Sequence, residues 1–587
     1  MYSTQYWIIP LSASIIGFIS LSPIAIRPSD RQANAQSIPD TTPDTLDEFP
    51  DIIDDTIPER PSDFPDSAPD EIPDAPQPGF EPLEPLPEPP ELSVPEVSFR
   101  IDTIIVNGST VSELDDEIER IVQAYEGREL TFNELLNVRS EITQLYVENG
   151  YVTSGAFLPS NQILTDGTVE IQVVEGSVEE IQVSGLRHLR PSYVRDRLQL
   201  ATDAPLDQRE LLEALQLLQL DPFISQINAE LTAGTTAGQN ILLVDVNEPS
   251  PFNLAVGGDN YRPPSIGSAQ GRVSVGYSNV FGVGDRFTGS YGRTDGLDIF
   301  NAGVSVPINA REGRLSFQFS SSESQIVDDD FEDLEIESET RSYGLNFRQP
   351  VARSPETEFA LGVGIDLRRR QTFILDDIPF SFSLGPEDGT SNVTVLRFFQ
   401  DWVNRGPRRV LAARSQFSFG IDAFNATVND TGVDARFFSW VGQFQWVQRL
   451  SSRNLLVTRI NTQLTPDSLL SLEQFSIGGV DTVRGYAQNQ LVADNGVVGT
   501  IEFRLPITPN PRRLQLTPFF EVGTVWNTNT PDPETSTIAG IGLGLRAEII
   551  PNLFARLDYG IPLIDVDRDA DSLQEDGFYF SLSFQPF

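Results

Sequence analysis

The sequence predicts an all-β protein, a 16-stranded transmembrane β-barrel that follows two small α/β domains. From residue 251 to residue 587, apolar and polar side chains alternate with period two, as they do in strands with one apolar and one polar face. The alternation divides into 16 segments of about 9–13 residues, the length of a tilted strand that crosses a bilayer. Connections after even-numbered segments are short, whereas several after odd-numbered segments are long. This asymmetry is typical of barrels with short periplasmic turns and longer exterior loops.

The composition limits the chemistry that the chain can carry out. Its formal net charge is -45, so it repels nucleic-acid phosphates, and we expect no nucleic-acid partner. It has no Cys, which excludes disulfides and thiolate sites, and one His, His188, which we place in a loop without a chemical role. Most zinc sites and the common Ser-His and Cys-His nucleophile pairs are thereby excluded. We expect no metal site, no cofactor and no enzymatic activity.

The N-terminus carries an apolar run, Trp7–Ile26, which ends in polar residues and in Ala-Asn-Ala at residues 33–35. This small-x-small pattern after an apolar run indicates a secretory signal peptide, here residues 1–36. No Lys or Arg precedes the run, so an uncleaved membrane anchor remains the alternative. No later stretch approaches the roughly 18 unbroken apolar residues that a membrane-spanning helix needs.

Residues 37–96 consist largely of Pro, Asp and Glu. Proline prevents both helix and ladder hydrogen bonds, and the carboxylates repel one another. The composition therefore predicts an extended, disordered linker. A plain spacer accounts for it, and an acidic ligand for a basic partner is the alternative.

Two copies of one small α/β unit follow, at residues 97–176 and 177–248. Each copy has the element order β-α-α-β-β. The second helix of the first copy is indicated by apolar residues at helical spacing and by Gly150, which supplies a C-cap. The apolar residues are Leu135, Val138, Ile142 and Leu145.

The strand-like segments have an apolar face and a polar face. Ile501 and Phe503 share one face of their segment, whereas Glu502 and Arg504 share the other. The segment at residues 436–449 likewise gathers aromatic side chains on one face, and these are Phe438, Trp440, Phe444 and Trp446. A soluble sandwich would rarely bury charges opposite such aromatic residues. A barrel with a lipid-facing exterior and a wet lumen explains both faces.

A glycine-rich loop at residues 476–496 follows the eleventh segment and carries a lone cation, Arg484. The short turns fix the direction of the strands, so this loop enters the barrel from the outer side. Two segments later, Glu521 shares the lumen face of its strand with Phe519 and Gly523. From the pattern alone, Arg484 can be a solvated loop charge.

Four groups of residues carry a resemblance to a known family. The loop residues Val483, Arg484, Gly485 and Tyr486 match its VRGF/Y motif. Phe519, Glu521 and Gly523 match its F-x-D-x-G motif, with Glu in place of the usual Asp. The stretches GGDN at residues 257–260 and NVFGVGD at residues 279–285 match its first barrel motifs. On these residues the mature chain resembles the two-partner secretion transporters, the hemolysin-activator branch of the outer-membrane protein 85 superfamily. The two α/β repeats resemble its polypeptide-transport-associated (POTRA) domains.

The resemblance implies an outer-membrane transporter that passes an unfolded exoprotein, its client, from the periplasm to the cell surface without a cofactor. The POTRA domains would lie in the periplasm and bind the client by β-augmentation, in which an extended segment pairs with an exposed strand edge. Candidate edges are Glu179–Val183 and Ile224–Leu231, with Ile181 and Ile227 between their ends. Outer-membrane lipid and the barrel-insertion machinery would be further partners.

The resemblance also implies that the loop folds back into the barrel, where its Arg contacts the acidic residue of the thirteenth strand. Three other functions stay open. One is an assembly factor of the same superfamily that inserts other barrels, which would usually carry more than two POTRA domains. The others are a passive porin and an outer-membrane esterase, and the missing His partner argues against the esterase.

The sequence departs from the family pattern in two further places. No amphipathic plug helix is readable before the first repeat, where family members often have one. The chain ends in the expected aromatic residue, Phe587, but this residue is out of phase with the apolar face of the last segment. That face consists of Phe578, Phe580, Leu582 and Phe584.

Overall fold

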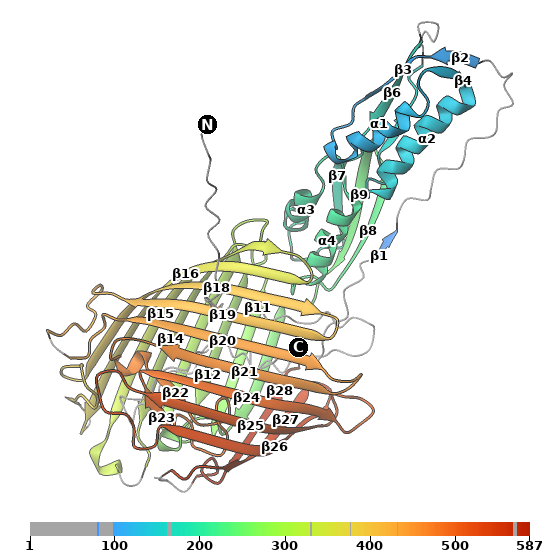
Figure 1. Cartoon of the computed structure of the whole chain (residues 1–587). Helices are drawn as coiled ribbons and strands as arrows, with labels where there is room; N and C mark the ends of the chain where they lie inside the picture. Colours follow the sequence, from blue (N-terminus) through green and yellow to red (C-terminus); the bar gives the residue numbers. More distant parts are fainter. Residues whose placement is uncertain are drawn as a thin grey trace, which may run out of the picture.

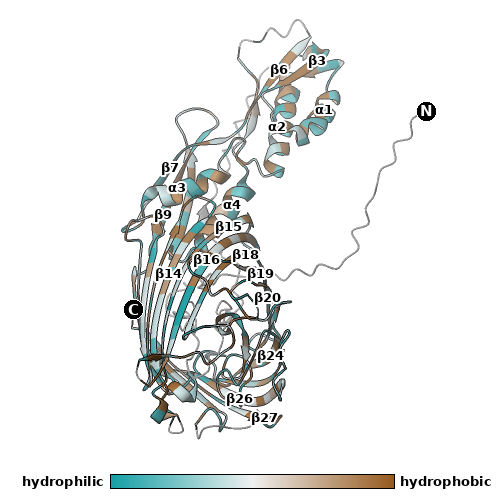
Figure 2. Ribbon diagram, turned by 90° about the vertical axis from the view of Figure 1, so that its left-hand side faces the viewer, coloured by the Kyte–Doolittle hydropathy of each residue, from teal (hydrophilic) through white to brown (hydrophobic). Residues whose placement is uncertain are grey.

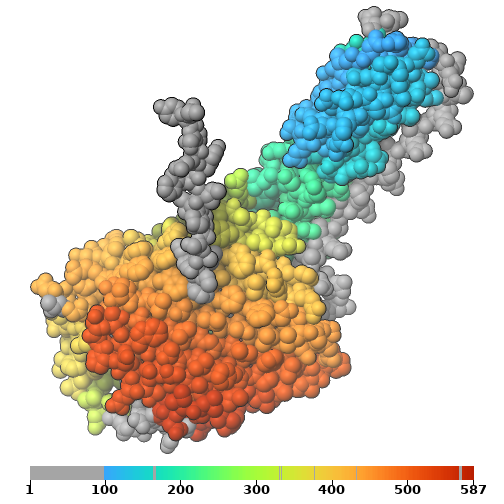
Figure 3. Space-filling model, in the orientation of Figure 1, coloured from blue at the N-terminus to red at the C-terminus, as the bar shows by residue number. Residues whose placement is uncertain are grey.

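The computed structural model describes residues 79–81 and 98–586, except for residues 161, 163–166, 329–330, 376, 431 and 567–571. Two small α/β domains project from one end of a closed β-barrel (Figures 1 and 3). The expected signal peptide, most of the expected linker and Phe587 lie outside the described residues. Within those residues, no helix is long and apolar enough to cross a membrane.

The first α/β domain contains the predicted β-α-α-β-β order with two additions. Its elements are β2 (Ser98–Ile101), β3 (Thr103–Asn107), η1 (Ser112–Leu114), α1 (Asp115–Gln123), β4 (Arg128–Thr131), α2 (Phe132–Glu148), β5 (Gly155–Phe157) and β6 (Thr168–Val174). The main sheet has the order β3-β6-β5, and the additional strand β4 pairs with β2. Helix α2 begins with a capping box, in which the Thr131 hydroxyl and the Glu134 carboxylate each accept the other residue's N–H. The helix ends before Gly150, whose φ of 97° supports the expected C-cap.

The second α/β domain has the predicted order without additions. Its elements are β7 (Ser177–Ser184), α3 (Pro191–Leu198), η3 (Gln199–Ala201), α4 (Gln208–Gln219), β8 (Gln226–Ala233) and β9 (Gln239–Asn247). Strand β9 lies between β7, which it pairs in parallel, and β8, which it pairs antiparallel. The apolar faces of α3 and α4 pack on this sheet around Val194, Leu215 and Leu242, which are fully buried.

A short strand from the linker joins the sheet of the second domain. Strand β1 (Gly79–Glu81) pairs in parallel with Asn228–Glu230 of β8. The expectation that all of residues 37–96 lack regular structure is therefore wrong at this point. The physical reason is that β8 is an edge strand whose unpaired N–H and C=O groups accept an extended segment of any suitable sequence.

Sixteen antiparallel strands close the barrel, as predicted. They are β10 (Phe252–Asp259), β11 (Gln270–Ser278), β12 (Arg286–Arg293), β13 (Leu297–Pro307), β14 (Arg314–Gln325), β15 (Glu337–Arg353), β16 (Thr357–Ile374), β18 (Thr390–Gly406), β19 (Arg409–Gly420), β20 (Phe438–Arg449), β21 (Leu455–Leu464), β24 (Asn495–Pro506), β25 (Gln515–Trp526), β26 (Thr537–Ile550), β27 (Leu553–Pro562) and β28 (Phe578–Phe584). The two-residue strand β17 (Ile378–Pro379) adds to the end of β16, and β10 pairs with β28 to close the ring. Short helices η4 (Pro264–Ile266) and η5 (Glu332–Leu334) lie in connecting loops.

The two faces of each strand point to different surroundings, as the alternation predicts. In β24, Ile501 and Phe503 are exposed on the outside, whereas Glu502 and Arg504 are buried on the inside. Hydrophobic and hydrophilic residues alternate along the strands in Figure 2. Closure leaves no free sheet edge, so every strand can pair its backbone groups with neighbours on both sides.

The loop between β21 and β24 folds into the barrel. It contains η6 (Ser471–Glu473) and a small hairpin of β22 (Phe475–Ile477) and β23 (Leu491–Ala493). Side chains of this hairpin form an apolar cluster with three lumen-facing residues of the wall, Val498, Val525 and Ile538. The loop therefore occupies the lumen rather than extending outward.

Candidate functional site

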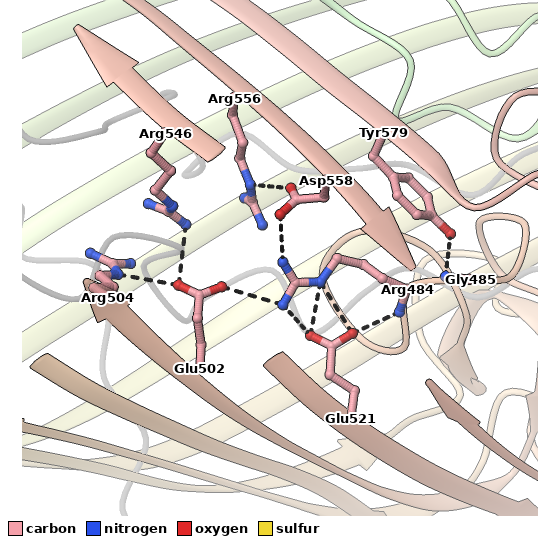
Figure 4. Close-up of polar contacts among 9 residues, drawn as sticks. All are labelled: Arg484, Gly485, Glu502, Arg504, Glu521, Arg546, Arg556, Asp558 and Tyr579. Atoms are coloured by element: carbon pink, nitrogen blue, oxygen red, sulfur yellow. Dashed lines mark hydrogen bonds and ion pairs between the residues drawn. The ribbon is translucent and has the colours of Figure 1, made fainter. Parts of the chain in front are cut away.

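The tip of the loop is a tight turn that directs one cation at the barrel wall. Its backbone bends where Gly478, Gly479 and Gly485 have positive φ, and Gly485 has a φ of 106°. Val483 and Tyr486 are buried in the apolar cluster of the hairpin, so they hold the two sides of the turn. Arg484 lies between them and points toward strands β24, β25 and β27 (Figure 4).

The structure brings Arg484 and Glu521 together. Arg484 Nη2 donates to Glu521 Oε1 at 2.6 Å, and the backbone N–H of Arg484 donates to Glu521 Oε2 at 2.7 Å. Arg484 Nε also lies 3.1 Å from Oε1 and 3.2 Å from Oε2. Glu521 thus accepts hydrogen bonds from both the guanidinium and the main chain of the loop.

Arg484 contacts two further carboxylates, so the interaction is a network rather than a pair. Nη1 donates to Asp558 Oδ1 at 2.9 Å, and Nη2 lies 3.3 Å from Glu502 Oε2. Three other arginines complete the network: Arg504 and Arg546 face Glu502, and Arg556 faces Asp558. Figure 4 shows these charged side chains pointing toward one another, with the contact between Tyr579 and Gly485 beside them.

The network is dry, which corrects the expectation that the pair sits in a wet lumen. The side chains of Arg484, Glu521 and Asp558 are 1%, 2% and 0% exposed. The hairpin β22–β23 and its apolar cluster lie beside the charges and shield them from water. Interactions between charges are stronger in such surroundings, and the loss of one partner is more costly.

The other residues of the strand-13 motif shape the place where Arg484 sits. The guanidinium carbon lies 3.3 Å from the centroid of the Phe519 ring, so the ring forms a cation–π floor. Gly523 leaves space for Ile477, since a Cβ there would lie 3.0 Å from the Ile477 Cδ1 atom. On the other side of the same strand, Phe520 and Val522 are exposed.

Sequence reasoning missed several residues that hold the tip. The Tyr579 hydroxyl accepts from the N–H of Gly485 at 2.8 Å and donates to the carbonyl of Tyr486. Gly560 lets the backbone of the tip approach β27, because a Cβ on Gly560 would lie 2.5 Å from the Gly485 nitrogen. In the sequence, these positions stand out only as small or polar residues on the lumen face of their strands. That pattern does not reveal which residue they contact.

A second charged cluster joins the second α/β domain to the short-turn end of the barrel. Glu312, in the turn between β13 and β14, accepts from Arg197 Nε of α3 at 2.6 Å and lies 3.1 Å from Arg314. Tyr193, also on α3, donates to Asp221 at 2.6 Å. All these contacts are buried or nearly so. They fix the domain against the barrel with charges rather than with apolar surface alone.

The carboxylates of this joint have pKa values shifted in opposite directions. Burial would raise the pKa of Glu312, but Arg314 and Arg197 outweigh it and hold that pKa below its ordinary value. Burial, together with the charge of Glu312, raises the pKa of Asp221. Glu312 is therefore the charged partner of the arginines, and Asp221 is the carboxylate whose ionisation the site disfavours.

The two other barrel motifs lie at joints of the structure. In the turn at residues 279–285, Asp285 accepts backbone N–H groups of the same turn, and the Gly282 carbonyl accepts from Arg190 N–H at 2.8 Å. The turn therefore docks the α/β domain. In the other motif, Asn260 continues the pairing of β10 and β28, since its side chain donates to the Phe578 carbonyl and accepts from Phe580 N–H.

The predicted client-binding residues are placed less favourably than expected. Ile181, Ile224, Ile227 and Leu231 are buried in the core of the second domain. Glu179 lies at a register shift of β7 and binds the N–H and hydroxyl of Thr235, and Val183 is partly buried. The four buried side chains have no surface to offer a client, whereas the Glu179 side chain is exposed and the backbone of β7 remains available for pairing. Ile224 also precedes β8, and the outer edge of β8 is occupied by β1.

Comparisons with known proteins agree with this architecture. The haemolysin secretion/activation protein ShlB/FhaC/HecB family matches residues 238–547, and the ShlB-type POTRA domain matches residues 99–176. The outer membrane transporter CdiB of Escherichia coli is 25% identical over 68% of this chain and 67% of its own length. The heme/hemopexin transporter protein HuxB of Haemophilus influenzae is 23% identical over 69% of this chain and 72% of its own.

A solved structure of CdiB from Escherichia coli superimposes with a TM-score of 0.64 at 21% identity, covering 86% of this chain and 94% of that one. This likeness shows a shared fold. The family match itself extends over more than half of the chain, from the end of the second α/β domain through most of the barrel. The chain is an outer-membrane protein with periplasmic POTRA domains, and it belongs to the haemolysin secretion/activation protein ShlB/FhaC/HecB family.

Proposed function

We propose that this chain secretes one partner exoprotein through its barrel, that its POTRA domains capture the unfolded client by β-augmentation, and that the loop tip at Arg484 controls the passage. The observation that carries the proposal is the seated loop. A buried network of four arginines and three carboxylates holds this loop across the lumen, and the strand edges of the POTRA domains lie at the other end of the same barrel.

The strand β1 supports capture by β-augmentation. It is an extended segment, distant in sequence, that has already added to the edge of β8. At the opposite edge of the same sheet, β7 pairs only with β9 among the described residues. We infer that β7 offers the open edge for a client, and that β8 is open only when β1 leaves it.

The family match favours secretion over the alternatives. The ShlB-type POTRA model and the barrel model of the secretion family both match, and the relatives reported above are named as transporters. The two POTRA domains are also fewer than an assembly factor for other barrels would usually carry. No contact in the described part of the chain specifically favours a passive porin.

The capture step can be tested with single cysteines, because the chain has none of its own. Gln182→Cys marks the open edge β7, and Asn228→Cys marks the edge of β8 that faces β1. Glu213→Cys, on the exposed side of α4, is the matched control. Unfolded client should protect the β7 cysteine from a maleimide and leave the control unchanged.

The pattern of protection decides among the edges. Protection of the β8 cysteine alone would show that the client displaces β1 instead. If no cysteine were protected by a client that the same protein secretes, capture at the second POTRA domain would be disproved. Secretion of the client to the cell surface, measured in the same strains, tests the transport function separately.

A further inference from the structure

We propose that Glu473 is a second anchor of the lumen loop, and that it holds the base of the loop to strands of the barrel wall that the Arg484 site does not touch. The inference rests on the proposed role of the loop in controlling the passage. Glu473 lies outside the loop motif, and it contacts strands of the barrel that the motif does not touch.

The base of the loop binds two arginines of the wall. Arg397 Nη2, on β18, donates to both carboxylate oxygens of Glu473, at 3.0 and 3.2 Å. Arg368 Nη1, on β16, lies 3.2 Å from Glu473 Oε1 and donates to the Leu472 carbonyl at 2.9 Å. The Glu473 side chain is 5% exposed, so these are buried, charge-assisted hydrogen bonds.

The wall presents Arg397 in a fixed position. Its Nη1 donates to the Ser418 hydroxyl at 2.8 Å, and its Nε bonds to Asp366 of β16. The guanidinium is therefore held by two neighbouring strands before the loop reaches it. Such a preorganised fork loses little side-chain entropy when it binds a carboxylate.

Apolar packing reinforces the same contact. Leu469, Leu470 and Leu472 at the base of the loop are 2%, 1% and 0% exposed. They form one cluster with Val393 and Val395, which precede Arg397 on the lumen face of β18. The apolar side chains that precede Glu473 therefore also hold the base against the wall.

The two anchors use different strands of the barrel and carry opposite charge. The base binds β16 and β18, whereas the tip binds β24, β25 and β27, which stand four to eight strands further round the ring of sixteen. At the tip the loop supplies the cation and the wall the carboxylates. At the base, eleven positions earlier, the loop supplies the carboxylate and the wall the cations.

The two sets of contacts share no residue, since Glu473 binds Arg397 and Arg368 whereas Arg484 binds Glu521, Asp558 and Glu502. The loop is therefore a strap with two separate attachments. Release of one attachment leaves the other in place, and passage through the lumen requires that both give way.

Cysteine labelling tests the base anchor directly. A single Ser471→Cys probe lies at the base, where Ser471 is 2% exposed, and a Gln488→Cys probe lies near the tip, where Gln488 is 7% exposed. Glu473→Gln keeps the side-chain shape and removes the charge. This substitution should raise the labelling rate of the base probe on the order of tenfold, because that factor corresponds to the loss of one charge-assisted hydrogen bond. The labelling rate of the tip probe should stay unchanged.

Two further variants serve as controls for Glu473→Gln. Glu473→Asp keeps the charge and should restore most of the protection of the base probe. Glu534→Gln makes the same chemical change on an exposed loop residue and should have no effect. Heat-modifiable migration establishes that each variant is a folded barrel.

The outcomes separate this inference from the proposed function. An unchanged labelling rate at the base in a folded Glu473→Gln variant would overturn the second anchor. In planar bilayers, the open fraction of the channel should rise further in Arg484→Ala with Glu473→Gln than in Arg484→Ala alone. If the base were released while the open fraction and the client secretion of the double variant matched those of the parent protein, the anchor would stand and the role of the loop in the passage would fail.

Discussion

Removal of the Arg484 side chain should release the tip of the loop without unfolding the barrel. In Arg484→Ala, Glu502 keeps Arg504 and Arg546, and Asp558 keeps Arg556. Glu521 is different, because its side-chain hydrogen bonds among the described residues all come from residue 484. The variant therefore leaves one buried carboxylate with only the backbone N–H of the loop as a donor.

The structure sets the size of the effect. Breaking a buried ion pair by removing one partner costs about 3–5 kcal/mol, whereas an exposed pair is worth about 0–1 kcal/mol. The backbone N–H at 2.7 Å remains, so we expect the lower end, about 3 kcal/mol. This corresponds to a shift of about a hundredfold in the ratio of released to seated loop. The barrel itself should stay folded, because sixteen paired strands still close the ring.

A double-mutant cycle with Arg484→Ala and Glu521→Ala measures the coupling. The readouts are channel open fraction and the labelling rate of a single cysteine at Gln488, with heat-modifiable migration as the measure of folding. The double variant has no orphaned carboxylate at residue 521, so the two effects should fall short of their sum by about 2 kcal/mol. Arg484→Lys should rescue poorly, because Lys cannot reach Glu521 in a bidentate manner and Asp558 at the same time.

Strict additivity of the two substitutions would refute this account, since it would show that the residues do not act as one unit. Loss of the folded barrel in Arg484→Ala would also refute it, because the network would then stabilise the fold rather than the position of the loop. An effect of less than about 1 kcal/mol would indicate a solvated pair, contrary to the burial seen here.

Three other predictions follow from the contacts described above. Gly560→Ala should release the tip from β27 and speed labelling of a tip cysteine, because the added Cβ meets the Gly485 nitrogen. Gly271→Ala, where a Cβ would have nothing within 4 Å, is the control. Equal labelling in the two variants would show that the tip does not approach Gly560 closely. Deletion of residues 97–176 should abolish secretion of the client while the barrel still inserts, and unchanged secretion would show that the first POTRA domain takes no part in recognition. Glu312→Gln should loosen that domain from the barrel, seen as a broader distance distribution between spin labels on the two parts. Because neighbouring arginines depress the pKa of Glu312, docking of the domain should be stable at pH values above the ordinary pKa of a carboxyl group and should weaken as the pH falls below about 4. A spin-label distance distribution that neither the substitution nor acid changes would show that apolar contacts hold the joint.

The barrel could be predicted from the sequence because its signals are local. Period-two alternation identifies each strand by itself, and the opposed characters of Ile501 and Glu502 on adjacent positions assign the outer and inner faces. Strand length and turn length then give the number and direction of the strands. Closure follows because an open edge in lipid would leave backbone groups unpaired.

The loop site could be predicted only in part. The motif around Arg484 and the lumen-facing Glu521 indicated one contact, between Arg484 and Glu521, and the structure contains it. The convergence of Glu502, Asp558 and Tyr579 on the same tip had no local signature, because these residues belong to different strands and Tyr579 lies 94 positions from Gly485. Such a meeting depends on the shear of the ring and the depth to which the loop descends.

The sequence by itself determined which residues form strands and helices, which strand faces meet lipid, and where the loop motif lies. Only the tertiary structure decided what each exposed edge and each buried charge binds. Strand β1 adds to β8 about 150 positions later in the chain, and Glu312 receives Arg197 from another domain. The physical reason is that hydrophobic periodicity is a property of neighbouring residues. The partner of a strand edge or of a buried charge is instead a group far away in the sequence. The folded chain brings that group within about 3 Å, and the local sequence pattern does not reveal which group it is.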